Sequence, residues 1–208
     1  MSQLSFPNLL EMAILAVVLL FSVIVHEVAH GYVALRNGDP TARVMGRITL
    51  NPIPHIDPIG TILLPLILLL SGSSLLFGWA KPVPVNPLNY RNYRWGEIAV
   101  SAAGPLSNIA LAVVFSILLR LGLGNIGLMK LALFGVKINL FLALFNLIPI
   151  PPLDGSHILA IALPRDLARM YAYLEPFGFI LILALFYTGI LGAIIMPFYR
   201  LLATILLG

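Results

Sequence analysis

The chain has 208 residues, of which 60% are hydrophobic and only 10% are charged, and it contains no cysteine. A soluble domain carries roughly a quarter of charged residues, so this composition predicts a membrane protein. Without cysteine, disulfides and thiolate metal ligands are excluded, and a metal site must use His, Asp, Glu, amide or carbonyl groups. The basic residues behind the net charge of +4 stand between hydrophobic segments, which is typical of topology signals and argues against nucleic-acid binding.

Hydrophobic segments follow one another along nearly the whole chain. The sequence predicts them at 9–35, 59–77, 98–121, 131–148 and 171–207, the last with candidate breaks at Gly189, Gly192 and Pro197. Most are long enough to cross about 30 Å of hydrocarbon as helices. We therefore expect an all-α, multi-pass membrane protein of about six transmembrane helices, with residues 1–208 forming one domain. The first segment lacks a basic n-region, so we expect it to stay in the mature protein.

The second segment, 59–77, is open to two interpretations. It contains Pro65 and ends in a polar run from Ser71 to Ser74. If it crosses the membrane, the basic clusters that flank it lie on opposite sides, against the tendency of Lys and Arg to stay in the cytoplasm. A re-entrant hairpin would keep both clusters in the cytoplasm, but we favour a crossing. The clusters are Arg36, Arg43 and Arg47 before the segment and Lys81, Arg91 and Arg94 after it.

The stretches 37–58 and 78–96 are rich in Pro and Gly. In the second, Val83 and Val85 alternate with prolines, which disfavour helix at the preceding residue. We therefore expect extended chain in both stretches.

The pentapeptide H-E-V-A-H at 26–30 closes an apolar run. Its histidines at i and i+4 lie on one helix face, where they can share a zinc ion. Glu27 can then take a proton from a water activated by the metal and pass it to the leaving amine. Three ionisable groups in an apolar helix need a compensating partner. The alternative is two neutral histidines and a protonated glutamate that are hydrogen-bonded to neighbouring helices.

A catalytic zinc needs a third protein ligand, and Asp154 is the best candidate. It follows prolines that end a hydrophobic segment and free backbone carbonyls, which only a protein-lined or wet cavity tolerates. The alternative is a helix N-cap, because Asp-Gly-Ser is also ordinary capping sequence.

Other polar residues have weaker claims. Asn146 could offer its amide to a substrate backbone or an oxyanion, or make an interhelical hydrogen bond. The segment from Gly104 to Asn108 suits close helix packing, the role we favour, and could also bring Asn108 to an unwound substrate. His55 and His157 could each ligate metal, although a structural histidine is the more common outcome.

Together these motifs resemble the site-2 protease family of intramembrane zinc metalloproteases over nearly the whole chain. The motifs stand in the family's order and comprise H-E-V-A-H, the loop from Asn51 to Gly60, G-W-A-K-P-V-P-V at 78–85, Gly104-Pro105 with Asn108, and 146–155. The zinc motif already lies in the first segment, so we expect no counterpart of the helix that precedes it in some relatives, and we expect 59–77 to be an additional segment. The resemblance is to a compact member without PDZ or CBS domains.

The resemblance implies one zinc ion per chain, bound by His26, His30 and Asp154. It implies catalysis by Glu27 and contact between Asn146 and substrate, in an enzyme that cleaves a transmembrane segment of another membrane protein. The active site would lie in the bilayer of the cell membrane, towards the cytoplasm.

It also implies a short extended or β region near the active site that holds unwound substrate. We assign this role to Val83, Val85 and Asn86, with Asn108 as a further candidate. Self-association of the chain is left open.

Two other functions compete with this one. A metal transporter or channel would use the same His and Asp residues, but its path needs polar groups across the whole membrane, which the sequence lacks. A catalytically inactive scaffold is disfavoured because the proposed ligands and the base are all present.

Overall fold

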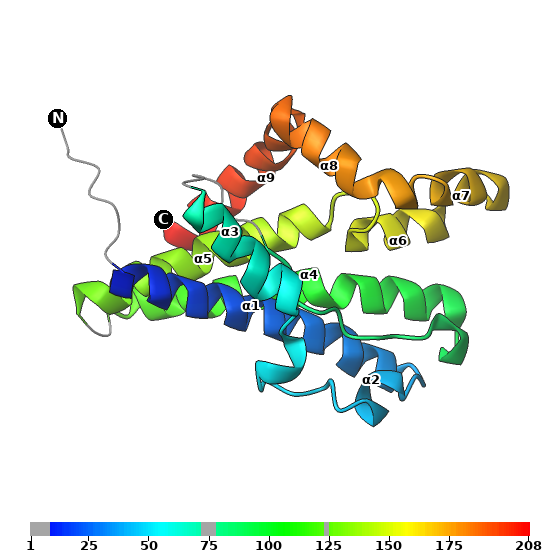
Figure 1. Cartoon of the computed structure of the whole chain (residues 1–208), viewed down its shortest axis with the longest axis horizontal. Coiled ribbons are helices and arrows are strands. Elements are labelled where there is room, and N and C mark those ends of the chain that lie inside the picture. Colours follow the sequence, from blue (N-terminus) through cyan, green and yellow to red (C-terminus); the bar gives the residue numbers. More distant parts are fainter. Residues whose placement is uncertain (1–8, 72–77, 123–124) are drawn as a thin grey trace.

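The computed structural model describes residues 9–71, 78–122 and 125–208, and every regular element in this part of the chain is a helix or helical turn, without a β-strand (Figure 1). The helices and helical turns, in chain order, are α1 (Leu9–Arg36), α2 (Thr41–Val44), η1 (Ile53–His55), η2 (Pro58–Leu63), α3 (Leu64–Leu70), η3 (Pro87–Asn89), α4 (Tyr93–Arg120), α5 (Ile126–Asn146), α6 (Asp154–Ala162), α7 (Arg165–Ala172), η4 (Glu175–Phe177), α8 (Gly178–Tyr187) and α9 (Ile190–Leu207).

Five helical stretches in the described residues are long and apolar enough to cross a membrane. They are Ile14–Arg36, Tyr93–Arg120, Ile126–Asn146, Arg165–Tyr187 and Ile190–Leu207. These stretches confirm a helical, multi-pass architecture. The sixth crossing that we predicted depends on the segment 59–77.

The segment 59–77 is described only in part. It begins as the π-helix η2 and continues as α3 to Leu70, while residues 72–77 lie outside the described residues. The thirteen residues from Pro58 to Leu70 would rise about 20 Å, which is short of a full crossing. The choice between a crossing and a re-entrant hairpin therefore stays a prediction.

Three long helices, α1, α4 and α5, pack together along the longest axis of the molecule (Figure 1). α8 and α9 form an angled pair, and α9 packs back against α5. The chain turns between α8 and α9 at Gly189, whose φ of +75° suits glycine, so the predicted break is confirmed there. The breaks predicted at Gly192 and Pro197 are wrong, because α9 continues through both residues.

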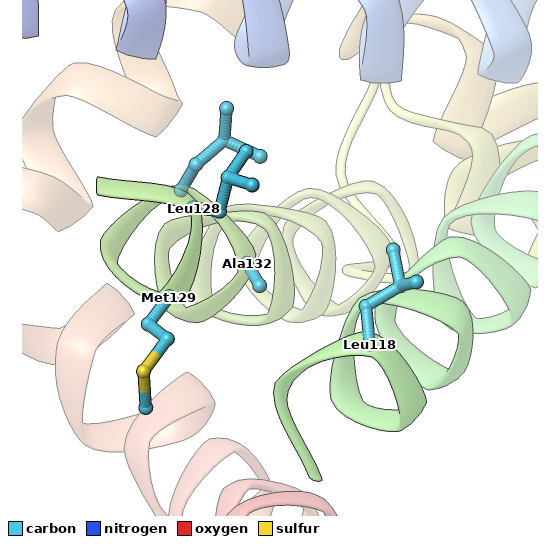
Figure 2. Close-up of a pocket in the computed structure, with 5 residues that line it drawn as sticks. Leu118, Leu128, Met129 and Ala132 are labelled. Carbon is cyan, nitrogen blue, oxygen red and sulfur yellow. The ribbon is translucent and has the colours of Figure 1, made fainter. Parts of the chain in front are cut away.

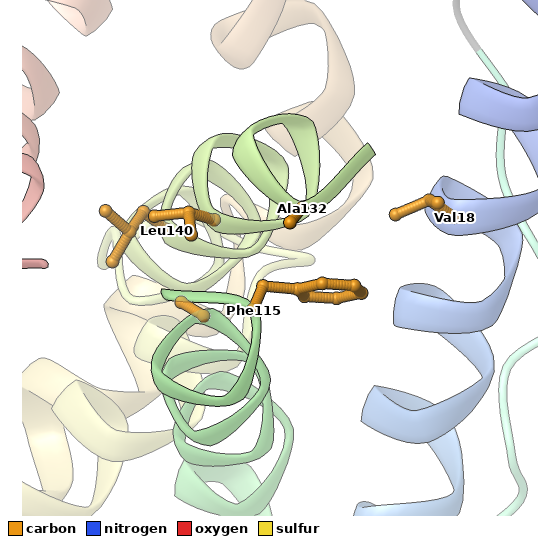
Figure 3. Packing of buried hydrophobic residues seen from close by; sticks show 6 residues of the cluster. Val18, Phe115, Ala132 and Leu140 are labelled. Atoms are coloured by element: carbon orange, nitrogen blue, oxygen red, sulfur yellow. The ribbon is translucent and has the colours of Figure 1, made fainter. Parts of the chain in front are cut away.

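An apolar cluster joins the three long helices at the end of the bundle where α1 begins. Figure 3 shows Val18 of α1 facing Phe115 of α4 and Ala132 of α5. At Gly135 of α5, a methyl group would overlap the Phe115 ring, so the glycine lets α4 and α5 approach closely. A cavity of about 150 Å³ between Leu118 and Met129 lies at the same end and has an apolar lining (Figure 2).

The polar stretches are only partly extended. The expectation of extended chain over 37–58 is wrong for α2 and η1, which form short helices there. Over 78–96 it is wrong for the turn η3 and for the first residues of α4. Residues 78–86 form no helix, as expected, and hydrogen bonds attach them to neighbouring segments at several points. The Lys81 N–H donates to the His55 carbonyl, and the Arg47 guanidinium donates to the carbonyls of Lys81 and Pro82.

Asp39 attaches the end of α1 to this extended stretch. Its buried carboxylate accepts hydrogen bonds from the N–H of Asn86 at 2.6 Å, from the Asn89 amide at 2.8 Å and from Thr41. Burial alone would raise the pKa of Asp39, but these hydrogen bonds outweigh it and hold the pKa below its usual value. The ionised form of the Asp39 carboxylate therefore stabilises the fold more than the protonated form does.

Because its folded-state pKa is depressed, Asp39 should stabilise the fold above its unfolded-state pKa of about 3.9. That contribution should be lost as the pH falls through the lower folded-state pKa. Asp39→Asn should cost about 1–3 kcal/mol at neutral pH, because an amide donor would face other donors. As the pH falls, the Asp39→Asn variant should also lose less of its free energy of unfolding than the wild type does.

Thermal unfolding in detergent between neutral and acidic pH measures both effects. Asp166→Asn is the matched control, because Asp166 is exposed on α7. An acid profile of Asp39→Asn equal to that of the wild type would contradict this role.

Candidate metal centre

Helix α1 places His26 and His30 one turn apart, on the face that packs against α4. Their Nε2 atoms lie 3.0 Å apart, and both residues are more than 90% buried. Asp154 arrives from a different part of the chain. The segment after α5 turns at residues 147–153, and Asp154 is the first residue of α6.

The Asp154 carboxylate faces both histidines. Its Oδ2 lies 3.2 Å from Nε2 of His26, and its Oδ1 lies 3.4 Å from Nε2 of His30. Leu153 holds the N-cap position of α6 and makes no side-chain cap, so Asp154 is not the N-cap residue of this helix. Oδ2 is buried and, among the described residues, accepts no well-directed hydrogen bond. A buried carboxylate oxygen without a donor is costly unless a cation occupies the site.

The other ring nitrogens determine which atoms carry hydrogen. Nδ1 of His30 lies 2.7 Å from the carbonyl oxygen of Val100, which can only accept. Nδ1 of His26 lies 2.6 Å from Oδ1 of Asn108. Both Nδ1 atoms therefore donate, and in the neutral rings both Nε2 atoms present lone pairs.

Two nitrogen lone pairs and a carboxylate thus converge on one buried point. The three candidate ligand atoms lie within 4.8 Å of one another. Ligands bound tetrahedrally to zinc at about 2.0–2.1 Å lie roughly 3.3 Å from each other. The two Nε2 atoms lie 3.0 Å apart, and they lie 3.2 and 3.4 Å from the two different oxygens of the Asp154 carboxylate. These nearest separations are close to the tetrahedral value, so the residue set suits a zinc ion.

Gly104 of α4 makes this arrangement possible. A Cβ atom at this position would lie 2.5 Å from Cε1 and Nε2 of His26, and it would also overlap the His30 ring. Only glycine allows α4 to approach the two imidazoles so closely. Sequence reasoning assigned Gly104 to helix packing, and the surface that it packs against is the pair of histidines.

Glu27 lies beside the cluster and is held by the extended stretch. Its Oε2 accepts a hydrogen bond of 2.7 Å from the N–H of Val83. The Val83 side chain is buried, and its Cγ1 lies where a methyl group on Gly31 would have to be. Residues 78–86 therefore orient the carboxylate that the sequence predicts as the general base.

The other predicted substrate-binding residues are more dispersed. Val85 is 36% exposed, whereas the backbone of Asn86 is engaged by Asp39 and its side chain caps η3. Asn146 is partly buried at the end of α5, and its amide donates to the Leu142 carbonyl. Asn108 is fully buried, and its side chain bonds to other residues of the bundle.

The two remaining histidines lie outside the metal cluster. His55 is fully buried in η1, with Nε2 2.9 Å from the Thr49 carbonyl. His157, one turn after Asp154 on α6, lies 3.1 Å from the Glu97 carboxylate of α4. This carboxylate raises the pKa of His157, although burial opposes the shift. The pair attaches α6 to α4 beside the cluster.

Sequence reasoning missed Glu97, Val100 and Asn139. Glu97 and Asn139 could have been noticed as polar residues within apolar segments, because such residues in membrane helices are usually paired or functional. No sequence signal marks Val100, because its contribution is a backbone carbonyl.

Two histidines and a carboxylate in a buried cluster, with a glutamate beside them, are the residue types that a metallopeptidase uses, and here they lie in a bundle of membrane-spanning helices. The chain belongs to peptidase family M50, the site-2 protease family, whose family model matches residues 14–125 and 122–185. It is an integral membrane zinc metalloprotease.

Named relatives agree with this assignment. The chain is 41% identical over 196 residues to "Putative zinc metalloprotease YwhC" of Bacillus subtilis, covering 89% of this chain and 85% of the relative. It is 34% identical over 171 residues to "Putative zinc metalloprotease Rip2" of Mycobacterium tuberculosis, covering 80% of this chain and 64% of the relative. No solved structure matches the chain.

Because Gly104 leaves room for both imidazoles, Gly104→Ala should displace them and lower zinc affinity by at least about 10-fold. Zinc affinity can be measured by chelator competition in detergent. Gly192→Ala on α9 is the matched control, since a methyl group there meets no atom within 4 Å in the described structure. Equal zinc affinity in the two variants would show that close approach at Gly104 is not required.

Proposed function

We propose that this protease hydrolyses peptide bonds within transmembrane segments of other membrane proteins, using zinc held by His26, His30 and Asp154 and Glu27 as general base. The observation that carries the proposal is the convergence of two histidine lone pairs and a carboxylate on one buried point between membrane-spanning helices. Such a point needs a cation, and zinc with three protein ligands keeps a fourth position for chemistry.

Zinc bound at this position supplies Lewis-acid chemistry, because it acidifies water and polarises a peptide carbonyl. The protein's own contribution is positioning and proton transfer. Glu27 lies next to His26 in sequence, and its carboxylate is oriented by the Val83 N–H. It accepts the proton of the attacking water and returns it to the leaving amine.

Substrate engagement is assigned to the extended stretch and the end of α5. The N–H and side chain of Val83 are already used within the protein, so we assign contact with an unwound substrate to the exposed Val85. Asn86 holds the stretch in place through Asp39. Asn146 would turn its amide from the Leu142 carbonyl towards the substrate.

The orientation that we propose places the active site towards the cytoplasm of a cell membrane. His26 lies ten residues before the end of α1 at Arg36, roughly 15 Å along the helix. At the same end of the bundle, the connecting segments and the first or last turns of the helices carry most of the basic residues, which supports this orientation. They are Arg36, Arg43, Arg47, Lys81, Arg91, Arg94, Arg165 and Arg169. A crossing by 59–77 would bring the bundle to six transmembrane helices.

Two substitutions separate metal binding from proton transfer. Glu27→Gln should keep zinc near one ion per chain and lower cleavage by at least about 100-fold, because the general base is lost. Asp154→Asn should lose both zinc and cleavage, because a ligand charge is removed. The measurements are zinc content of the purified protein and cleavage of a reporter with one transmembrane helix.

Glu175→Gln and Asp166→Asn are the matched controls, because both residues are exposed. Cleavage that survives Glu27→Gln would overturn the role of the base. Full zinc content in Asp154→Asn would overturn the ligand set.

A further inference from the structure

A chain of buried side chains leads from His26 into the apolar interior of the bundle. Nδ2 of Asn108 on α4 donates to Oδ1 of Asn139 on α5 at 2.9 Å. Nδ2 of Asn139 donates to Oγ of Ser22 on α1 at 2.9 Å, and that hydroxyl donates to the Val18 carbonyl at 2.8 Å. Ser22, Asn108 and Asn139 are all 0% exposed. The chain of hydrogen bonds therefore connects all three long helices to His26.

Backbone carbonyls fix the donor-to-acceptor direction of this series of hydrogen bonds. The carbonyl of Gly135 can only accept, and it lies 2.9 Å from Nδ2 of Asn139. That contact directs Oδ1 of Asn139 towards Asn108. The carbonyl of Ser22, 3.3 Å from Nδ2 of Asn108, constrains that amide in the same sense.

The direction of the amides decides which nitrogen of His26 carries hydrogen. With Oδ1 of Asn108 towards the ring, Nδ1 must donate and Nε2 is free to bind metal. If the Asn108 amide were reversed, its NH₂ group would face Nδ1 and favour the opposite tautomer. Nε2 would then carry the hydrogen and point it at His30 and Asp154.

We propose that Asn139 is a positioning residue for metal binding, which holds the Asn108 amide in the orientation that fixes the metal-binding tautomer of His26. The proposal rests on the ligand set proposed above. It gives a role to a polar residue that no motif marks and that does not itself approach the metal cluster. A merely structural Asn139 would join α5 to α1 and α4 without any influence on the imidazole.

A double-mutant cycle distinguishes these two roles. Asn139→Leu removes the amide at similar volume and should lower zinc affinity by about 10-fold, the lower end of the usual effect of residues behind a metal ligand. Asn108→Asp supplies two acceptor oxygens, so it receives the His26 hydrogen in either orientation. In the Asn108→Asp background, Asn139→Leu should therefore cause no loss of zinc affinity.

The measurement is chelator competition for zinc on the full chain in detergent, together with thermal unfolding of the zinc-free protein. A loss of zinc affinity from Asn139→Leu that is equal in both backgrounds would overturn the proposal, as would no loss in the wild-type background. Nitrogen-15 NMR of labelled histidine in the zinc-free protein gives a second readout. Asn139→Leu should move His26 away from the form protonated only at Nδ1, and an unchanged tautomer would also overturn the proposal.

Two further variants keep the result interpretable. If Asn139→Leu does not fold, Ser22→Ala tests the next hydrogen bond, with a smaller loss of zinc affinity that Asn108→Asp again abolishes. His26→Ala tests the ligand set separately. If it lowers zinc affinity and the Asn139 and Ser22 variants do not, only the positioning role is wrong. If it leaves zinc affinity unchanged, the ligand set fails and the positioning role fails with it.

Discussion

The structure depends on one electrostatic constraint, which is that two imidazole lone pairs and a carboxylate face one another in a buried site. Each of these groups repels the others unless a cation lies between them, and the low dielectric of the interior increases that repulsion. The backbone carbonyl of Val100 and the Asn108 amide prevent the rings from relieving the strain by a change of tautomer. The site is therefore organised for a metal before the metal arrives.

The surrounding helices can be understood as the means of holding this arrangement inside a membrane. Gly104 brings α4 against the imidazoles, and the turn before α6 brings in Asp154. The contact between Glu97 and His157, one turn after Asp154, attaches α6 to α4. Few polar groups are available in an apolar bundle, and Ser22, Asn108 and Asn139 are buried with hydrogen-bond partners that define their orientations.

The extended stretch 78–86 connects the metal centre to the loops outside the bundle. Val83 holds Glu27, while Arg47 and Asp39 hold the segments on either side of Val83. The same short stretch thus orients the proposed base and presents the proposed substrate surface at Val85. A displacement of this stretch would therefore affect substrate contact and proton transfer together.

The sequence by itself determined the membrane class, because apolar runs of 18 or more residues allow few other folds. It also determined the pairing of His26 with His30, because helical periodicity places i and i+4 on one face. It could only suggest Asp154, Asn146 and Asn108, since local periodicity does not report which distant segments meet. The tertiary structure decided that Asp154 faces the histidines and that Asn108 and Asn139 lie behind His26. Those contacts join residues 31 to 128 positions apart, and they arise only when α1, α4, α5 and α6 pack together.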